Sequence, residues 1–398
     1  QWKRPLLVAS VDASQCYDCI AHSMVALTLR AYKVRAGSVM GMLQPIHCME
    51  FYLRTGYGEL KDYVGSKENT KQGACQGNGA APATWQQISA LMIQAQHRHH
   101  HGITIQSPIL KRTIKQVGIL FVDDTNLWNG LEEDSDVLDV VNAAQESVNT
   151  WGQSLIATGG VLNPEKCNYT IHDMKVDKAG KWDYTDAEPK TKKGDKNEDD
   201  ELDNLEPFEE VQLGVPRVNG DVTAINLLKS SEAAKNLGLF ARPDGDNSPH
   251  LAQMKSRMET WTTKVKNGTL PTRSVWTSYT HQLWAGMKYG LGASLATMKE
   301  LREGLGSLDF YLISSLGVVR TIKTQWRYLP PAFSGMGLFD LTTEATAATI
   351  NSLLQHYGTE SPVGITLQAT LENLQIELGV RGCPLDYDFQ TWGHLATD

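Results

Sequence analysis

The pattern of apolar residues changes near residue 240 of this 398-residue chain, and the change limits the folds open to it. Before that point, short apolar runs of strand character alternate with segments of helical spacing. From Pro249 onward the pattern is mostly helical, with Trp261, Trp276 and Trp284 in one stretch. Strands mixed with helices, followed by helices alone, predict an α+β domain and then a helical one.

The net charge of -8 is concentrated in one segment. Between residues 195 and 210, nine acidic residues stand against Lys196 alone, a local net of -8 that leaves the remainder at zero. Such a self-repelling run predicts a disordered linker or insertion, which we place at residues 187–210. The acidic total therefore does not exclude a nucleic-acid partner.

Composition also bears on the compartment. No apolar stretch reaches the roughly 18 to 20 residues needed to cross a bilayer, so we expect no membrane association. Six scattered cysteines form no disulfide framework, which favours an intracellular, reducing compartment, nuclear or cytoplasmic. The first residues, Gln1-Trp-Lys-Arg, are neither a start methionine nor a secretory leader, and we expect a fragment of a longer protein.

Two adjacent aspartates, Asp123 and Asp124, follow the apolar run Val117 to Val122. Alone they would indicate an ordinary turn, because aspartate bonds its own backbone and suits turns. A second carboxylate, Asp12, follows another apolar strand, Leu6 to Val11, far upstream. Two strands of one sheet can bring such carboxylates together, and hard cations prefer their oxygens. The pattern therefore favours a metal site.

Further elements follow from spacing and turn residues. Helices are expected over residues 20–32, 43–55, 83–96 and 135–150, with apolar faces at Met24, Leu27 and Leu29 in the first and at Val137, Leu138, Val141 and Ala144 in the last. Hairpins are expected over residues 114–128 and 211–227, and a strand to about Ile171 with an extension at Trp182 to Tyr184.

Two other clusters could be metal or redox sites. Cys16 and Cys19 form a CxxC, but no second cysteine pair completes a tetrahedral site. Residues 97–101 contain four histidines, which fan around a helix, so a solvated helix end is the favoured interpretation.

The order of motifs resembles the reverse transcriptases of retroelements, most closely the non-LTR retrotransposon type. In that family the palm carries an aspartate, then an aromatic residue and a second aspartate, matched here by Asp12, Tyr17 and Asp18. A glycine, a Gln-Gly pair and a proline opening a helix are matched by Gly73, Gln76, Gly77 and Pro82, and the aromatic-x-Asp-Asp motif by Phe121 to Asp124.

Two weaker matches follow in the same order. Leu162-Asn163-Pro-Glu-Lys166 resembles the turn before a palm-edge strand. Leu237-Gly238 looks like the Leu-Gly pair at the palm–thumb junction, more so than Leu213-Gly214. The resemblance covers about residues 5 to 290, with decreasing specificity.

The resemblance implies a right-hand polymerase palm, an antiparallel, ferredoxin-like sheet with packed helices, followed by a mostly helical thumb. The expected divisions are a palm at 1–186, the acidic linker at 187–210, a palm edge and junction at 211–245, a thumb at 246–330, and a C-terminal helical region at 331–398.

The implied activity is RNA-directed DNA polymerase, a nucleotidyltransferase that adds dNTPs to a DNA primer on an RNA template. Two Mg²⁺ ions, for which Mn²⁺ could substitute, would be held by Asp12, Asp123 and Asp124. We expect Asp12 and Asp123 to be the principal ligands, and Asp124 to support them because neighbouring strand residues face opposite ways.

The family also implies roles for substrate-contacting residues. Tyr17 would lie under the sugar of the incoming nucleotide and exclude a ribose 2'-hydroxyl, and Gln76 and Gly77 would approach the template–nucleotide pair. Lys166 would protonate or neutralise pyrophosphate. Cations among the tryptophans after residue 240, such as Lys255, Lys264 and Arg273, suit a thumb that grips a duplex, or an ordinary charged helix face.

The chain departs from the family at its start, because only eleven residues precede Asp12 and the basic fingers are missing. We therefore expect these residues alone to be inactive or weak as an enzyme. The alternative is a catalytically inactive, polymerase-derived nucleic-acid-binding or scaffold protein. An unrelated carboxylate-metal hydrolase is a third interpretation, but it leaves Gln76-Gly77 unexplained. The source element, the flanking domains and the oligomeric state are not predicted.

Overall fold

The computed structural model describes residues 5–14, 16–64, 72–74, 78–131, 137–176, 182–185, 212–294 and 296–388, with positions 390 and 393. The chain divides into two compact units. The first, called the sheet unit, comprises Gln1–Thr104 and Lys115–Lys229; the second, the helical unit, comprises Ile105–Ile114 and Ser230–Asp398. The boundary after Lys229 lies within the segment expected to join palm and thumb.

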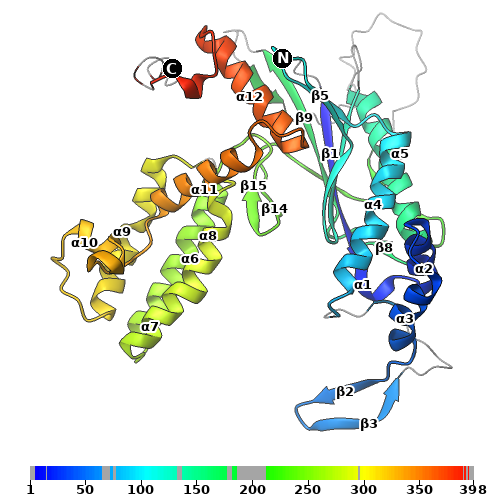
Figure 1. The fold of residues 1–398 in the computed structure, drawn as a ribbon, viewed down its shortest axis with the longest axis horizontal. Coiled ribbons are helices and arrows are strands. Elements are labelled where there is room, and N and C mark those ends of the chain that lie inside the picture. The colour runs from blue at the N-terminus through cyan, green and yellow to red at the C-terminus, as the bar shows by residue number, and fades with distance from the viewer. Residues whose placement is uncertain are drawn as a thin grey trace, which may run out of the picture. The chain divides into compact units, whose positions relative to one another are not determined.

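The sheet unit is built on a seven-stranded mixed sheet with the order β10-β9-β1-β7-β6 (Figure 1). Its strands are β1 (Leu6–Ser14), β6 (Gly118–Phe121), β7 (Asp124–Gly130), β8 (Val161–Leu162), β9 (Asn168–Val176), β10 (Trp182–Thr185) and β13 (Asn226–Leu228). β1 is central because it pairs antiparallel with both β7 and β9. Only β13 pairs parallel, along the far edge of β9.

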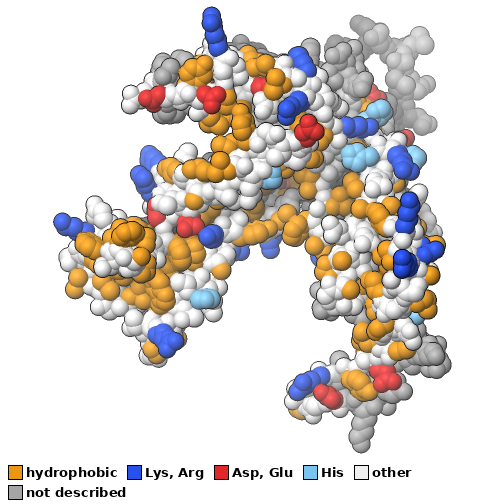
Figure 2. Space-filling view, viewed as in Figure 1, with side chains coloured by type: hydrophobic (Ala, Val, Ile, Leu, Met, Phe, Trp, Pro, Cys, Tyr) orange, Lys and Arg blue, Asp and Glu red, His pale blue; other side chains and the backbone are white. Residues whose placement is uncertain are grey.

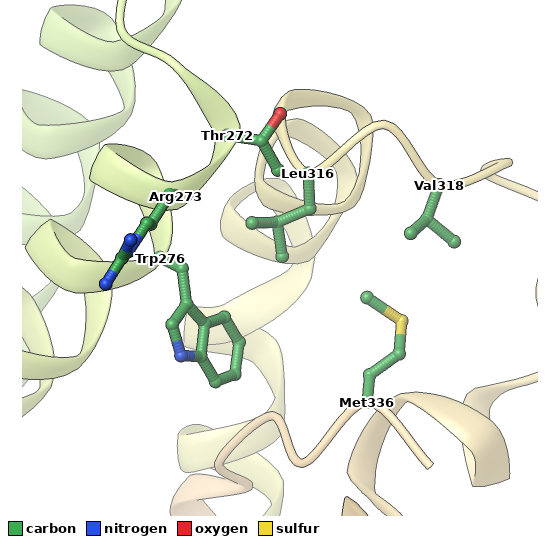
Figure 3. A pocket seen from close by; sticks show the side chains of 6 residues that line it. All are labelled: Thr272, Arg273, Trp276, Leu316, Val318 and Met336. Carbon is green, nitrogen blue, oxygen red and sulfur yellow. The ribbon is translucent and has the colours of Figure 1, made fainter. Parts of the chain in front are cut away.

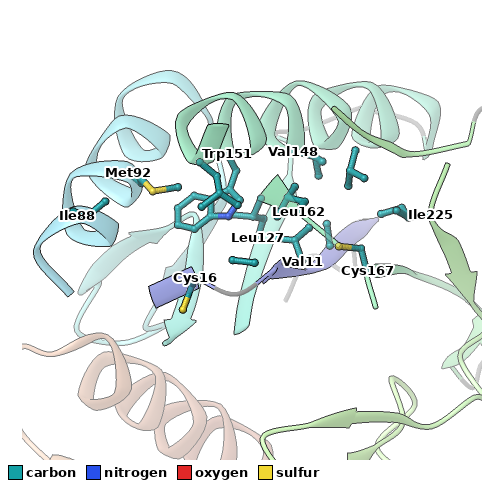
Figure 4. Close-up of a cluster of buried hydrophobic side chains, with 14 of the residues drawn as sticks. Val11, Cys16, Ile88, Met92, Leu127, Val148, Trp151, Leu162, Cys167 and Ile225 are labelled. Carbon is teal, nitrogen blue, oxygen red and sulfur yellow. The ribbon is translucent and has the colours of Figure 1, made fainter. Parts of the chain in front are cut away.

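One face of the sheet is covered by helices (Figure 4). Every second residue of β1 is buried, as alternation on a one-sided sheet requires. Trp151 and Val148 of α5 (Val137–Ala157) pack over Val11 and Leu127, and α4 (Ala81–His99) closes the same layer. Each fully buried side chain of this size contributes about 1.5–3 kcal/mol of transfer free energy.

Several sequence predictions need correction here. The predicted helix over 43–55 is wrong: α3 spans Ala36–His47, and β2 (Phe51–Thr55) pairs with β3 (Gly58–Val64). The predicted helix over 20–32 is confirmed as α2 (His22–Ala31), and a short helix, α1 (Cys16–Cys19), precedes it. Leu27 and Leu138, expected on buried faces, are 63% and 37% exposed. In α2 the buried face is displaced by about one position, to Val25 and Thr28. In α5 Val141 and Ala144 are buried as predicted, and Leu138 lies beside that face.

Other predicted elements are confirmed. The helices over 83–96 and 135–150 exist and are longer, and the strand at Trp182–Thr185 pairs with β9. The hairpin over 211–227 is β11 (Gly214–Pro216) with β12 (Val222–Ala224). The acidic segment 187–210 lies outside the described residues. The α+β class is thus confirmed.

The helical unit contains α6 (Ser248–Asn267), α7 (Thr272–Ser278), α8 (Ala285–Leu291), α9 (Met298–Ser315), α10 (Thr324–Tyr328), α11 (Leu341–His356) and α12 (Pro362–Leu378). A π-helical turn, Tyr279–Trp284, joins α7 to α8. The small hairpin of β14 (Ala234–Asn236) and β15 (Leu239–Ala241) precedes them. Trp284 stacks on Phe339 in the core, with ring centroids 4.6 Å apart. No described helix is long and apolar enough to span a membrane.

The tip of a hairpin from the first half of the chain belongs to the helical unit. The hairpin consists of β4 (Ile103–Gln106) and β5 (Thr113–Gln116), and its tip is held by Glu372 of α12. The Glu372 carboxylate accepts the N–H of Ile109 at 2.6 Å and of Leu110 at 3.1 Å, and Gln368 donates to it at 2.8 Å. Because this buried carboxylate is hydrogen-bonded to the hairpin tip and to Gln368, it holds the tip against α12.

Candidate active site

Strand register places two of the three predicted carboxylates directly opposite each other. Asp12 of β1 pairs with Asp124 of β7, and Phe121 pairs with Asp124 across the hairpin. Directly opposed residues on antiparallel strands point to the same face of the sheet. The turn therefore contains Val122 and Asp123, while Asp124 is the first residue of β7. Asp124, expected to face away, shares the sheet face of Asp12.

The turn that carries Asp123 has an unusual backbone. Val122 has φ of 58°, a left-handed value that a β-branched residue adopts only under constraint. Trp85 of α4 donates its indole N–H to the Val122 carbonyl. The Asp123 carbonyl in turn accepts the N–H of Ala13 at 3.3 Å. The hydrogen bonds from Trp85 and Ala13 hold this strained turn from two sides and so fix the backbone positions of Asp123 and Asp124.

The backbone of Asp12 is held by the turn that follows β8. The N–H of Asn163 donates to the Asp12 carbonyl at 2.9 Å. The Asp12 N–H donates to Cys167 Sγ at 3.4 Å. This turn, Asn163 to Cys167, contains the Asn163 and Lys166 of the Leu-Asn-x-x-Lys pattern, and these hydrogen bonds hold it beside Asp12.

Lys166 lies in the same turn and pairs with Asp12. Its Nζ is 3.4 Å from Asp12 Oδ2, with the lysine side chain 65% exposed and the aspartate side chain 13% exposed. Asp12 Oδ2 is buried and accepts no hydrogen bond. The contact is an ion pair without a hydrogen bond, so the oxygen keeps capacity for another ligand.

The electrostatics of neighbouring groups show that the carboxylates act on one another. Burial raises the pKa of Asp124, and the charges of Asp123 and Asp12 raise it further, while Lys166 lowers it. Burial and the charge of Asp123 are the leading causes that raise the pKa of Cys16 to about 12. Cys167 is raised to a pKa of about 11, chiefly by burial. Both thiols therefore remain protonated at neutral pH.

Tyr17 is half-buried at the edge of this cluster. Its ring packs against the core of the sheet unit, and its pKa is raised by burial and by the charges of Cys16 and Asp123. The Tyr17 carbonyl accepts the N–H of Ala74 at 2.7 Å.

The segment that precedes Gln76 and Gly77 is held against the residues after β1. Gly73 has φ of 101°, and a Cβ at this position would lie 2.5 Å from the Asp18 carbonyl oxygen, so only glycine fits. His22 Nε2 lies 2.6 Å from the Gly73 carbonyl oxygen. Gln76 and Gly77 themselves lie outside the described residues, and their predicted role stays a prediction.

The donor set suits a divalent cation in type. Three carboxylates offer hard oxygen ligands, and Asp12 Oδ2 is an orphaned buried acceptor. In the described part of the chain, no three His, Cys, Asp or Glu side chains are arranged to hold an ion as they stand. Mg²⁺ commonly takes one or two carboxylates and completes its shell with water and substrate phosphates, so the arrangement fits such an ion.

The cations predicted for a thumb fall into two groups. Arg257 donates to the Gly286 carbonyl at 2.9 Å, and Lys266 Nζ lies 5.5 Å from the ring centroid of Tyr311, so both have structural contacts. Lys255, Lys264 and Arg273 are exposed. Trp261 is buried and donates to Ser278, which makes it a packing residue.

A pocket of about 530 Å³ in the helical unit is lined by Thr272, Arg273, Trp276, Leu316, Val318 and Met336. Figure 3 shows Trp276, Leu316 and Met336 directed toward one another, with the Arg273 guanidinium turned away. Hydrophobic side chains also gather on the visible surface over α9 and α10 (Figure 2). The lining has no acid or nucleophile pair, so the pocket is not a candidate catalytic site.

Sequence reasoning missed three residues that position the carboxylates: Trp85, Asn163 and Cys167. Asn163 was noted only as part of a motif, and Cys167 only as a scattered thiol. Their roles depend on contacts across 37 to 155 positions of the chain. The Leu-Asn-x-x-Lys pattern offers a signal for Asn163, which belongs to it, and for Cys167, which directly follows it, whereas no local pattern indicates Trp85.

No protein-family model matches the chain, and no curated protein matches it. Among solved structures, it is similar to telomerase from Candida albicans in complex with a TWJ fragment of telomeric RNA, at 12% identity and a TM-score of 0.32, over 98% of this chain and 49% of that one. The corresponding Candida tropicalis structure matches at 12% identity and a TM-score of 0.32, over 92% and 49%. The chain thus spans about half the length of these structures, and likeness at this level supports no argument.

Proposed function

We propose that the chain is the palm and thumb portion of an RNA-directed DNA polymerase, a reverse transcriptase of the non-LTR retrotransposon type. The observation that carries the proposal is the Asp12–Asp124 register on neighbouring central strands, with Asp123 in the adjoining turn and Lys166 against Asp12. Four charged residues from three distant segments of the chain lie at one end of one sheet. If Asp12 had a purely structural role, both of its carboxylate oxygens should accept hydrogen bonds, but Oδ2 accepts none.

The proposed reaction is transfer of a nucleotide from a dNTP to the 3'-hydroxyl of a primer paired with RNA. Divalent ions held by Asp12, Asp123 and Asp124 would stabilise charge on the attacking and leaving oxygens. The chain itself supplies rigid placement, because β1 and β7 fix two carboxylates and the Val122 turn fixes the third. Lys166, mostly exposed, is free to reach a phosphate.

Tyr17 is proposed to select the sugar. Its position after β1 and its coupling to Asp123 support a place beside the reacting groups. In this role the ring occupies the volume that a ribose 2'-hydroxyl would need. Substitution by alanine should then raise ribonucleotide incorporation about 10-fold or more relative to deoxyribonucleotides.

One observation favours the second candidate, an inactive polymerase-derived protein that binds nucleic acid. The described carboxylates do not form a three-ligand metal group, and Lys166 already neutralises Asp12. Such a protein would retain the fold and the exposed cations of α6 and α7. It would bind a primed RNA template without extending the primer.

The test is incorporation of a labelled dNTP on a primed RNA template with Mg²⁺, using the chain and three variants, Asp12→Asn, Asp123→Asn and Asp124→Asn. Asp221→Asn is the matched control, because that exposed aspartate bonds only within its own turn. Incorporation that all three variants lose and the control keeps supports the polymerase. Because these residues alone are expected to be weak as an enzyme, template binding without incorporation supports the scaffold only if the longer protein expected to contain them also fails to incorporate the dNTP.

A further inference from the structure

Asp12 already has a cation beside it. Lys166 Nζ stands 3.4 Å from Asp12 Oδ2, the same oxygen that accepts no hydrogen bond. The lysine neutralises the charge without satisfying the lone pairs of the oxygen. A buried carboxylate in that condition binds any better-fitting cation in competition with the lysine.

Lys166 is attached so that its head group can leave without disturbing Asp12. Its backbone N–H and that of Cys167 both donate to the Asn163 carbonyl at 3.1 Å, which fixes the turn. The Asp12 backbone is bonded to Asn163 and Cys167, not to Lys166. The lysine side chain is 65% exposed, so water can take over its ammonium at little cost.

We propose that Lys166 is a resident counter-ion of Asp12 that competes with a divalent metal ion for the carboxylate. In the metal-free site the Lys166 ammonium neutralises the charge of Asp12, and an arriving metal ion displaces that ammonium. This inference rests on the proposed metal-dependent function and deepens it. It assigns to Lys166 the control of metal affinity, in addition to any contact with a phosphate.

The displaced ammonium has a further consequence. A positive charge released beside the carboxylates becomes available to an anionic phosphate group at the moment the ion is bound. Metal binding and phosphate binding are therefore coupled through one side chain. Removing the lysine should strengthen metal binding and weaken that coupling.

The experiment measures Mn²⁺ binding to the whole chain by electron paramagnetic resonance of free Mn²⁺, with no nucleotide or template. Lys166→Met removes the charge and keeps the apolar stem, and should bind Mn²⁺ about 2- to 10-fold more tightly than the unchanged chain. Lys166→Arg keeps a cation and should remain close to the unchanged chain. The matched control is Lys288→Met in the helical unit, because the Lys288 side chain is 61% exposed and its Nζ lies 3.1 Å from Glu344 Oε2 in a comparable ion pair.

The outcomes separate the inference from the function beneath it. If Lys166→Met binds Mn²⁺ no more tightly, while Asp12→Asn abolishes binding, the counter-ion role is wrong and the metal site stands. If neither the unchanged chain nor Lys166→Met binds Mn²⁺, the proposed metal site fails and the inference falls with it. If Lys288→Met and Lys166→Met tighten binding equally, general electrostatics explains the effect and the inference is overturned.

A coupling measurement adds an independent check. Pyrophosphate added to the Mn²⁺-loaded chain should raise Mn²⁺ affinity less in Lys166→Met than in the unchanged chain or in Lys288→Met. Equal enhancement in all three would overturn the coupling. Thermal unfolding of each variant establishes that the substitution leaves the protein folded.

Discussion

Two buried carboxylates in this molecule are treated in opposite ways. Glu372, 3% exposed, accepts two backbone N–H groups and one side-chain amide. Asp12, with its side chain 13% exposed, leaves Oδ2 without any hydrogen bond and has only a loose ion pair. The Glu372 carboxylate has its acceptor sites filled by groups that hold the fold together, whereas the Asp12 carboxylate can still accept another ligand.

This difference separates structural charge from functional charge. Both side chains are acidic and buried, so composition and burial alone do not distinguish them. The number of hydrogen-bond donors around each oxygen does. If the distinction holds, substitutions at Glu372 should cost stability and substitutions at Asp12 should cost chemistry.

The largest expected effect is on nucleotide incorporation by Asp12→Asn. Loss of the carboxylate removes a cation ligand, and incorporation should fall about 100-fold or more. Stability should change by less than about 0.5 kcal/mol, because loss of a weak ion pair is offset by relief of repulsion from Asp123 and Asp124. Single-nucleotide extension and denaturant unfolding measure the two effects. A variant that loses several kcal/mol would make Asp12 a structural residue like Glu372.

The next effect is on stability, at Glu372. Glu372→Ala leaves the N–H groups of Ile109 and Leu110 without their acceptor, which should lower the free energy of unfolding by about 3 kcal/mol. Glu377→Ala, on the exposed side of α12, should change it by less than about 0.5 kcal/mol. Urea unfolding compares the two. Equal effects would show that helix α12, rather than the carboxylate, is responsible.

The pH dependence should differ in sign between the two sites. Burial pushes the pKa of Glu372 up, but hydrogen bonds from Ile109, Gln368, Leu110 and Ser107 leave it below its usual value. Its stabilisation is therefore present above the unfolded-state pKa of about 4.3 and is lost as pH falls through the folded-state pKa. The raised pKa of Asp124 has the opposite sign: its contribution is complete below the unfolded-state value and is lost as pH rises through the folded-state value.

Calorimetry of Glu372→Gln and Asp124→Asn at pH 7 and at lower pH tests this pair of signs. At pH 7, Glu372→Gln should melt below the unchanged chain and Asp124→Asn at or above it. The Asp124→Asn difference should shrink as the pH falls toward about 4, and the Glu372→Gln difference should shrink only as the pH falls below about 4.3. If both substitutions shift the melting temperature in the same direction, Glu372 and Asp124 do not differ in the sign of their pH dependence.

The smallest effect is expected at Trp85. Trp85→Phe keeps the buried ring and removes the N–H that holds the Val122 carbonyl, and should cost about 1 kcal/mol. Nucleotide incorporation should fall by more than the loss of stability alone predicts, because the released turn contains Asp123 and its carboxylate would move with the turn. Trp128→Phe, in β7 and half-buried, is the control. Unchanged incorporation by Trp85→Phe would show that the turn needs no support from α4.

Much of the fold could be predicted from patterns of residues that are neighbours in the chain. Alternating burial along β1 and the apolar run before Asp123 could be recognised because each depends on neighbours in the chain. The helix Ala36–His47 could not, because Gly37, Gly41 and Pro45 all argue against helix and only tertiary burial of Val39, Leu43 and Ile46 sustains it. The exposure of Leu27 in α2 and of Leu138 in α5 likewise depends on what each helix packs against.

The candidate site divides in the same way. Asp12, Asp123 and Asp124 were found from the sequence because carboxylates after apolar strands are a local signal. Which aspartate faces Asp12 depends on strand register, and register is set by the two-residue turn at Val122, which spacing alone does not define. The Lys166 ion pair joins residues 154 positions apart in the printed sequence and has no local signal at all.

The hairpin tip held by Glu372 has a practical consequence for taking the molecule apart. The helical unit is discontinuous in sequence, because Ile105–Ile114 belongs to it while the residues on either side do not. A cut after Lys229 would therefore yield a C-terminal piece that keeps Gln368 but lacks the N–H donors of Ile109 and Leu110, so the desolvated Glu372 carboxylate loses its backbone hydrogen bonds. Dissection at that point should give an insoluble or proteolysed piece, whereas supplying the 105–114 peptide in trans should restore it.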